Sequence, residues 1–168
     1  MVTIIDFYDY GMSESYSQLK IWKRFENVNN PIDNTSQGRK LITQTEYYEI
    51  GQIIYVQHEW KNVETINGVK TAVTYRITYE GTLGDLAGDF NGAIKTVQKI
   101  WREIVDNQFD PLTNISQGKK LVTRVQNYEF AEKISDLYIW KNVENVRSGA
   151  ARLVTYTLMY EFGMEDVW

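Results

Sequence analysis

The stretch SQGRKLIT at residues 36–43 recurs as SQGKKLVT at residues 116–123, and this recurrence decides the fold. A second pair, WKNVE at residues 60–64 and 140–144, keeps the same separation of 80 residues. The aligned region that begins at Pro31 needs no gap and contains 16 identities in 34 positions. Two copies are too few for a solenoid, which usually needs three or more repeats. The sequence therefore predicts a tandem duplication within one compact body.

The similarity continues on both sides of this region, with the separation changed by one residue. Upstream, KIW occurs at residues 20–22 and again at residues 99–101, and downstream both copies contain Thr-Tyr followed by Tyr-Glu. Single-residue slips belong in loops, so each copy is predicted to be one module with variable joints. The expected division is residues 1–83 for the first repeat, with an extra N-terminal strand, and residues 84–168 for the second.

Alternating apolar and polar side chains predict the strands of each module. Residues 71–80 and 153–162 place apolar side chains at every second position, which is typical of a strand with one face on a core. Turn signals come before both, Asn-Gly at 67–68 and Ser-Gly at 148–149, and they predict β-hairpins. Further strands are then expected at residues 41–50, 60–66, 121–130 and 140–146, which are rich in β-formers.

A helix is predicted at the start of each module. In residues 89–107 apolar side chains recur every three or four positions, the spacing of an amphipathic helix, and Asp89 is a suitable N-cap. The first copy has a weaker apolar stripe over residues 13–25, with Ser13 as its cap. Each module is thus predicted to run α-β-β-β and to end in a hairpin.

The two ends of the chain resemble each other. YDYGMSE at residues 8–14 is similar to YEFGMED at residues 160–166, so residues 2–10 are predicted to be a strand like those that close the modules. The predicted fold class is α+β, a tandem duplication of an αβββ module preceded by one N-terminal strand. Its sheets are mostly antiparallel, with two helices packed on one side. Because an uncovered edge strand is a liability, the first strand should either complete the sheet of the second repeat or pair with a neighbouring subunit.

Composition excludes several classes of protein. The chain has no Cys, which rules out disulfides, iron–sulfur clusters, thiolate-bound zinc and a cysteine nucleophile. A net charge of −4, shared evenly by the two halves, argues against sequence-specific binding of nucleic acid. No secretory signal and no run of about 18 apolar residues for a membrane helix is found. A soluble protein of the reducing cytosol, without membrane contact, is expected.

Catalytic and metal-binding patterns are missing. His58 is the only histidine, and Tyr138 occupies its position in the second copy, whereas a metal site or a catalytic triad needs companions. We interpret His58 as a half-exposed strand residue. Asp85 and Asp89 are interpreted as helix caps, since the spacing of a calcium loop is absent. No catalytic residue, cofactor or metal is predicted; an enzyme using acid pairs from the two repeats is the weaker alternative.

The repeated SQG passage has two interpretations. It is either a tight joint in which Gly supplies the turn, or a contact surface that uses the Gly amide and the two basic side chains. Together with tyrosines of the N-terminal strand and the last tryptophan, it supplies the candidate interface residues: Gln37, Arg39, Lys40, Gln117, Lys119, Lys120, Tyr8, Tyr10 and Trp168.

Aromatic residues are in excess, with 12 Tyr, 5 Trp and 6 Phe. Two tryptophan pairs are duplicated, Trp22 with Trp101 and Trp60 with Trp140, which favours core anchors. Tyrosines on strands can instead line a ligand cleft or an assembly interface.

In composition and architecture the chain resembles small virion components of tailed bacteriophages. Tail-tube, tail-terminator and neck-ring subunits are often Cys-poor α+β proteins of about this size, and tube-like domains are sometimes duplicated. The resemblance implies a non-enzymatic structural subunit of a homo-oligomeric ring or tube. Its partners would be itself and other assembly proteins, first in the host cytoplasm and then in the virion. The alternative is a small-ligand-binding module with an aromatic-lined cleft between the two repeats.

Overall fold

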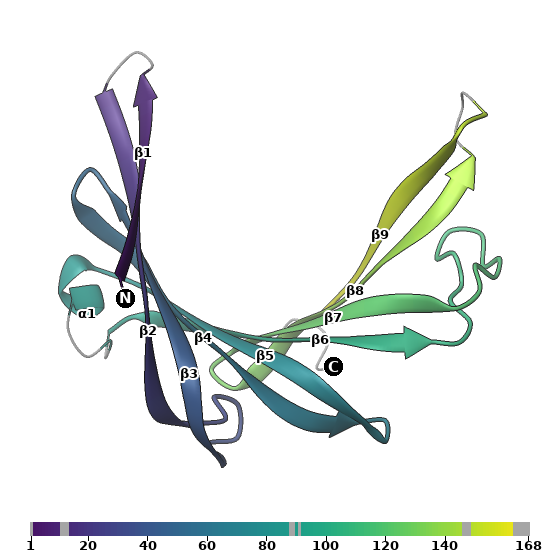
Figure 1. The fold of residues 1–168 in the computed structure, drawn as a ribbon, viewed down its shortest axis with the longest axis horizontal. Helices are drawn as coiled ribbons and strands as arrows, with labels where there is room; N and C mark the ends of the chain where they lie inside the picture. The colour runs from purple at the N-terminus through teal and green to yellow at the C-terminus, as the bar shows by residue number, and fades with distance from the viewer. Residues whose placement is uncertain (1, 11–13, 88–89, 91, 146–148, 163–168) are drawn as a thin grey trace. The chain divides into compact units, whose positions relative to one another are not determined.

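The computed structural model describes residues 2–10, 14–87, 90, 92–145 and 149–162, and of residues 6–10, 14 and 15 it describes the backbone. In these residues nine strands form one antiparallel sheet, in which they follow one another in chain order (Figure 1). One short helix, α1 (Leu83–Ala87), precedes the sixth strand. The strands are β1 (Val2–Tyr10), β2 (Glu14–Asn29), β3 (Ser36–Glu49), β4 (Gln52–Ile66), β5 (Val69–Glu80), β6 (Ile94–Val105), β7 (Lys120–Glu129), β8 (Glu132–Asn145) and β9 (Ala151–Glu161).

The predicted α+β class is wrong, because both expected helices are strands. Most of residues 13–25 lies in β2 and most of residues 89–107 lies in β6, while the expected caps Ser13 and Asp89 lie outside the described residues. The structure is nearly all-β, with α1 as its one short helix in the part of the chain that is described. None of the described helical structure is long and apolar enough to cross a membrane.

The sequence of β6 shows why the helix prediction failed. Its two buried residues, Val97 and Trp101, are four positions apart and therefore share a face in a strand as well as in a helix. Lys99, between them, shares that face in a strand and forms an ion pair with Glu64 at 3.5 Å. Six of the twelve residues of β6 are β-branched, and such side chains favour strands.

The other predicted strands are confirmed, with shifted and mostly longer bounds. Residues 41–50, 60–66 and 71–80 fall mainly in β3, β4 and β5, and their counterparts in the second copy fall mainly in β7, β8 and β9. Because β2 and β6 take the places of the two expected helices, the repeated unit consists of four strands. The first copy is β2–β5, the second is β6–β9, and β1 precedes both.

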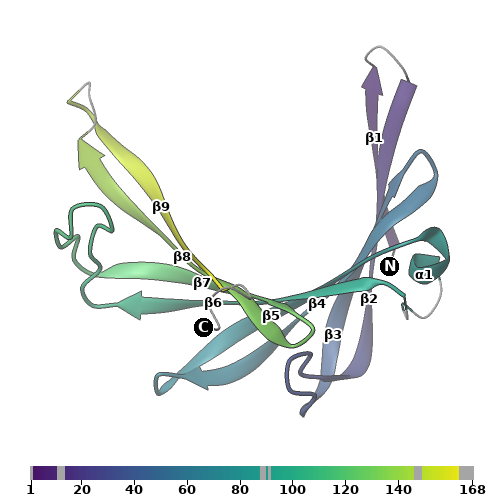
Figure 2. The same ribbon diagram turned by 180° about the vertical axis from the view of Figure 1, so that it is seen from behind.

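The N-terminal strand pairs with β2 of its own chain. The register runs antiparallel from Val2 opposite Trp22 to Tyr10 opposite Glu14, and the two strands lie side by side in both views (Figure 2). The expectation that β1 completes the sheet of the second repeat is therefore wrong. In the sheet order β1 and β9 are the two end strands.

The repeated SQG passage forms a bulged joint in each copy. In the first, Val28 is opposite Gly38 and Asn29 is opposite Ser36, so Gln37 is an extra residue on its strand. Gly38 has a φ of +80°, as expected for the glycine of a β-bulge. In the second copy Gln108 is hydrogen-bonded through its backbone to both Gln117 and Gly118, at 2.7 and 2.9 Å, and Gly118 has the same φ, which supports the tight-joint interpretation for both copies.

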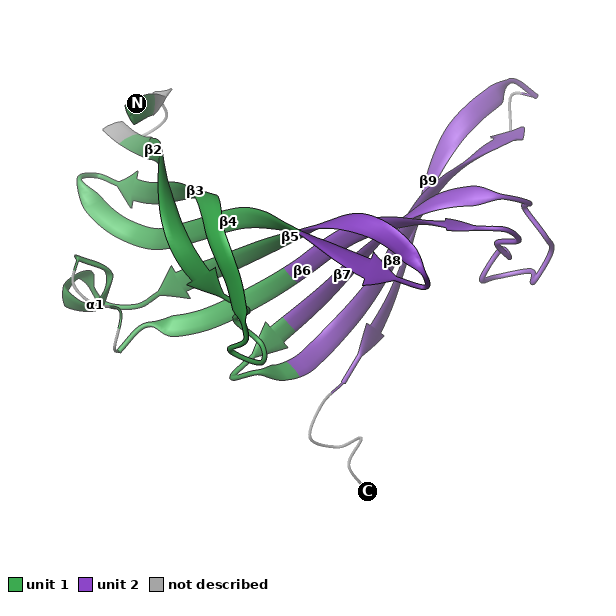
Figure 3. Cartoon of the chain, turned by 60° about the horizontal axis from the view of Figure 1, so that its bottom comes forward, with its two compact units in different colours: residues 1–62, 74–98, 128–132 green, residues 63–73, 99–127, 133–168 purple. Residues whose placement is uncertain are grey.

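The chain forms two compact units, which Figure 3 colours separately. The first comprises residues 1–62, 74–98 and 128–132, and the second comprises residues 63–73, 99–127 and 133–168. In the first unit α1 contributes buried Leu86, which packs with Ile53 and Val56 of β4. In the second unit the buried residues include Trp101, Val122 and Trp140.

Asp85, interpreted from the sequence as a helix-capping acid, lies in the first turn of α1, although the helix expected at residues 89–107 is a strand. Its carboxylate accepts hydrogen bonds from the Thr82 hydroxyl at 2.8 Å and from the Thr82 N–H at 3.3 Å. These bonds hold the first turn in place and so present Leu86 to the core.

Replacing the bulge glycines should destabilise the protein through the backbone alone. A Cβ at Gly38 or Gly118 would meet no atom within 4 Å, so the cost comes from the positive φ. We expect Gly38→Ala and Gly118→Ala each to lower the free energy of unfolding by about 1 kcal/mol. Gly84→Ala is the matched control, because that site is equally open and its φ is not left-handed. Urea unfolding that shows no difference between the control and the bulge variants would contradict this account.

Candidate functional site

A buried tryptophan organises the first repeat. The Trp60 indole N–H donates a hydrogen bond to the Gln37 side-chain oxygen at 2.8 Å, across β4 and β3. The ring stacks on Tyr75 of β5, with centroids 5.9 Å apart, and the Tyr75 hydroxyl is 3.5 Å from the Asn30 amide. Trp60 is 5% exposed and Tyr75 is fully buried. The bulge at Gly38 thus delivers the glutamine that satisfies the buried indole.

The second repeat builds the same arrangement. The Trp140 indole N–H donates to Gln117 at 2.8 Å, and its ring stacks on Tyr156 with centroids 5.3 Å apart. The Tyr156 hydroxyl donates to the Glu144 carboxylate and lies 3.4 Å from Asp110, and this bonding raises the pKa of Tyr156 to about 12. Trp60 and Trp140 therefore occupy equivalent places, as the alignment of the repeats predicts. Both rings are core anchors.

The structure places the SQG residues in different roles. Gln37 and Gln117 are held by the buried tryptophans. Arg39 is exposed, with its guanidinium carbon 5.1 Å from the centre of the Phe25 ring.

The structure shows fewer contacts for the other candidate interface residues. Lys119 is exposed, and Lys40 and Lys120 are half-buried, with Lys40 opposite Glu26 in the strand register. The backbones of Tyr8 and Tyr10 pair with those of Tyr16 and Glu14. The side chains of Tyr8 and Tyr10 and the whole of Trp168 lie outside what the structure describes.

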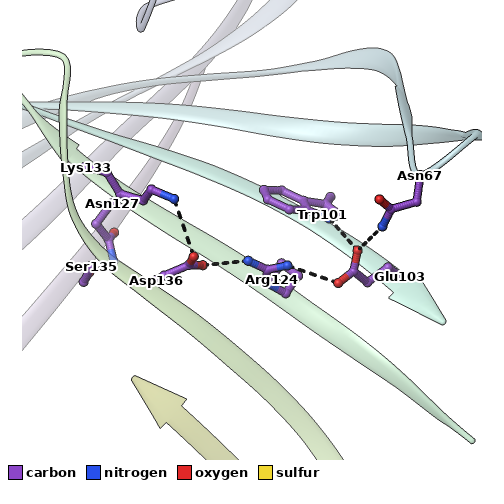
Figure 4. Close-up of polar contacts among 8 residues, drawn as sticks. All are labelled: Asn67, Trp101, Glu103, Arg124, Asn127, Lys133, Ser135 and Asp136. Carbon is purple, nitrogen blue, oxygen red and sulfur yellow. Dashed lines mark hydrogen bonds and ion pairs between the residues drawn. The ribbon is translucent and has the colours of Figure 1, made fainter. Parts of the chain in front are cut away.

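A charged cluster in the second unit is the most elaborate polar feature among the described residues (Figure 4). Arg124 of β7 forms ion pairs with Glu103 of β6 at 3.1 Å and with Asp136 of β8 at 2.9 Å. Lys133 approaches the second oxygen of Asp136 at 3.6 Å. Glu103 also accepts a hydrogen bond from Asn67 at 3.4 Å. Two acids and two bases thus form a connected network across three strands.

Aromatic rings enclose the guanidinium of Arg124. Its central carbon lies 3.9 Å from the centre of the Tyr138 ring and 5.2 Å from that of Trp101, which are cation–π distances. The side chain is 13% exposed, and its Nε is buried without a hydrogen-bond partner among the described residues. Both carboxylates are occupied by the same cation, so neither is placed as a free acid or base. The cluster can hold three strands together; it offers no nucleophile.

The alignment of the repeats contains a signal for this cluster, although none of its residues was among the predicted site residues. The offset of 80 residues sets Arg124 against Gln44 and Asp136 against Val56, which is fully buried. Lys133 similarly corresponds to buried Ile53. Three charged residues at positions that are apolar or neutral in the first copy therefore mark the ion-pair network of the second.

His58 packs among aromatic rings on β4. Its ring lies edge-on to Tyr79 at 5.3 Å and to Phe90 at 5.8 Å, and its Nε2 is buried without a partner in the described residues. Burial, together with the positive charge of Arg24, lowers the pKa of His58 to about 4. The imidazole is therefore neutral at pH 7. Within the described residues, no group of three or more His, Asp and Glu side chains could hold a metal ion.

Comparison with known protein families, with curated proteins and with solved structures finds no match for this chain. The structure itself defines an antiparallel β-sheet protein built from two four-stranded repeats.

Replacing Arg124 should lower the stability of the protein, because it leaves the ion-pair network incomplete. Arg124→Gln introduces the residue of the first repeat but leaves Glu103 and Asp136 without their guanidinium, and we expect a loss of about 3 kcal/mol in the free energy of unfolding. Adding Asp136→Val, which copies Val56, should recover at least about 1 kcal/mol by removing one unpaired carboxylate. Arg102→Gln, at an exposed position of β6, is the control. Urea unfolding in which the double variant is less stable than Arg124→Gln would contradict the network.

His58 should make the stability depend on pH. The unfolded chain binds a proton at His58 below the ordinary pKa of 6.5, whereas the folded chain binds it only below about pH 4. The free energy of unfolding therefore falls as the pH drops from 6.5 to 4. His58→Tyr, which copies Tyr138, should remove this contribution. Between pH 7 and pH 4.5 the wild type should lose roughly 1–2 kcal/mol more than the variant, allowing for solvent screening. Identical losses of stability in wild type and variant, from urea unfolding at the two pH values, would show that the pKa of His58 is not lowered in the folded protein.

Proposed function

We propose that the chain is a non-enzymatic structural subunit that assembles with copies of itself through the edges of its sheet. The observation that carries the proposal is the pair of end strands, β1 with 9 residues and β9 with 11. Each has one side without a strand partner in the described sheet, and neither contains the Lys or Pro that commonly protects an edge. Such an edge is a template for another chain.

Both end strands carry exposed apolar side chains. On β1, Val2 and Ile4 are each 55% exposed. On β9, Leu153 is 62% and Met159 is 49% exposed. Apolar side chains beside an open row of backbone groups favour association, because a partner strand would pair the backbone and bury these side chains together.

The chemistry of the described residues supports a role without catalysis. Glu103 and Asp136 are engaged by Arg124, and His58 is half-buried and neutral at pH 7. The alternative of an aromatic-lined ligand site is not favoured by Trp60 and Trp140, since both rings are buried against tyrosines of their own repeat.

For the particular assembly we propose a ring or tube of the kind found in phage tails and necks, with other assembly proteins as partners. This part rests on size, composition and internal duplication, without the α+β architecture that also suggested it. The subunit would be made in the host cytoplasm and then become part of the virion.

The mass of the protein in solution tests the proposal. Light scattering over a wide range of protein concentration should show species larger than the 19.7 kDa monomer. Ile4→Lys combined with Met159→Lys should return the protein to the monomer, because lysine on an edge strand opposes pairing. Ile104→Lys with Val143→Lys, at exposed positions on the inner strands β6 and β8, is the matched control and should still assemble.

A wild type that stays monomeric throughout would contradict assembly. Loss of assembly in the control as well would place the contact on a face of the sheet. Electron micrographs of the wild type should show rings or tubes if the proposed form of assembly is correct.

A further inference from the structure

The outer edge of β9 is regular along its whole length. β9 pairs with β8 in an unbroken antiparallel register from Asn145 opposite Ala151 to Ser135 opposite Glu161. No bulge interrupts this register, although a bulge is one of the devices that turn an edge away from other chains. The other side of the strand therefore offers an uninterrupted row of backbone groups.

The sequence of β9 is nearly a palindrome about Tyr156. The residues on either side of this centre are Thr and Thr, then Val and Leu, then Leu and Met, and the outer pairs are Arg with Tyr and Ala with Glu: ARLVTYTLMYE. When a strand pairs antiparallel with its own copy, residues equally far from the centre stand opposite each other. A palindromic strand thus presents matching side chains to itself.

Both faces of such a pairing are complementary. On the face that carries Tyr156, Val154 would stand opposite Leu158, and Arg152 opposite Tyr160, a cation beside an aromatic ring. On the other face, Leu153 would stand opposite Met159, and Thr155 opposite Thr157. All four residues of this second face are exposed in the single chain. The pairing would remove their apolar surface from water.

We propose that the partner of β9 is β9 of a second copy of this chain, paired antiparallel about a twofold axis at Tyr156. The proposal rests on the proposed self-assembly and names the strand, the symmetry and the register of its contact. The contact is isologous, so by itself it pairs two copies and joins two sheets into one, and the β1 edges stay open for contacts between such pairs. Tyr156 is suited to the axis because its ring is stacked on Trp140 and its hydroxyl is bonded to Glu144.

The other end strand does not have this property. The middle residue of β1 is Asp6, so the same pairing of β1 with its copy would set two aspartates opposite each other. Like charges directly opposite destabilise a strand pair. The palindromic pattern and this contrast both favour β9 for the twofold contact.

Charge pairs at the two threonines test the register. In the proposed dimer Thr155 of each copy faces Thr157 of the other, so Thr155→Glu with Thr157→Glu creates two pairs of like charges. We expect the dissociation constant of the dimer to rise about tenfold or more. Within its own chain Thr155 faces Lys141 and Thr157 faces Ile139, so the glutamates meet no acid there. Circular dichroism checks that the variant is folded, and Thr65→Glu, exposed on inner strand β4, controls for added charge.

A charge reversal at one position should restore the dimer. Thr155→Glu with Thr157→Lys sets opposite charges across both pairs and should bind as tightly as the wild type or more tightly. Mixing the Thr155→Glu/Thr157→Glu chain with a Thr155→Lys/Thr157→Lys chain should give mixed dimers, which native mass spectrometry distinguishes from either chain with itself.

The outcomes separate this proposal from the one it rests on. A monomeric wild type overturns the self-assembly and the β9 pairing together. A wild type that assembles, with no change in the doubly acidic variant, overturns the β9 pairing and leaves self-assembly standing. If both the doubly acidic and the charge-reversed variants dissociate, the twofold register is overturned. Dissociation of the first and recovery in the second and in the mixture support it.

Discussion

A single hydrogen bond, from a buried indole N–H to a glutamine, is the constraint around which each repeat is arranged. In a sheet the backbone carbonyls are occupied by neighbouring strands, so a tryptophan buried between strands needs a side-chain acceptor. Gln37 and Gln117 meet this need at the same distance of 2.8 Å. The bulge at Gly38 inserts Gln37 as an extra residue on β3, and Gln117 lies in the corresponding joint of the second copy. The sequence SQG is therefore repeated because Trp60 and Trp140 are repeated.

Apart from the buried tryptophans, the two repeats differ in the side chains at equivalent positions. The first packs Leu86 of α1 against Ile53 and Val56. The second places Lys133 and Asp136 at the corresponding positions and connects them to Arg124. Ionic residues are tolerated there because each charge has an opposite partner. The same sequence positions thus carry an aliphatic cluster in one copy and an ion-pair network in the other.

The sequence was sufficient for the strands with a clean alternation and for the equivalence of the repeats. It failed at β2 and β6, where residues four apart satisfy the helical and the strand period at once, as Val97 and Trp101 do. Contacts across strands, such as the ion pair of Lys99 with Glu64, favour the strand over the helix. These contacts cannot be read from the sequence, because they depend on which strands pair. The role of Gln37 was missed for a related reason, since its indole partner lies 23 residues away on another strand.

The order of strands in the sheet also bears on how the chain folds. Every strand has its sequence neighbours as its sheet neighbours, so no pairing must wait for a distant segment. In the β2–β3 pair even the outermost partners, Ser17 and Glu49, are 32 residues apart. Loop closure is then inexpensive in entropy, and the sheet can grow hairpin by hairpin from the first one formed. Such a chain can begin to fold during its own synthesis, each new strand adding to the edge left by the one before.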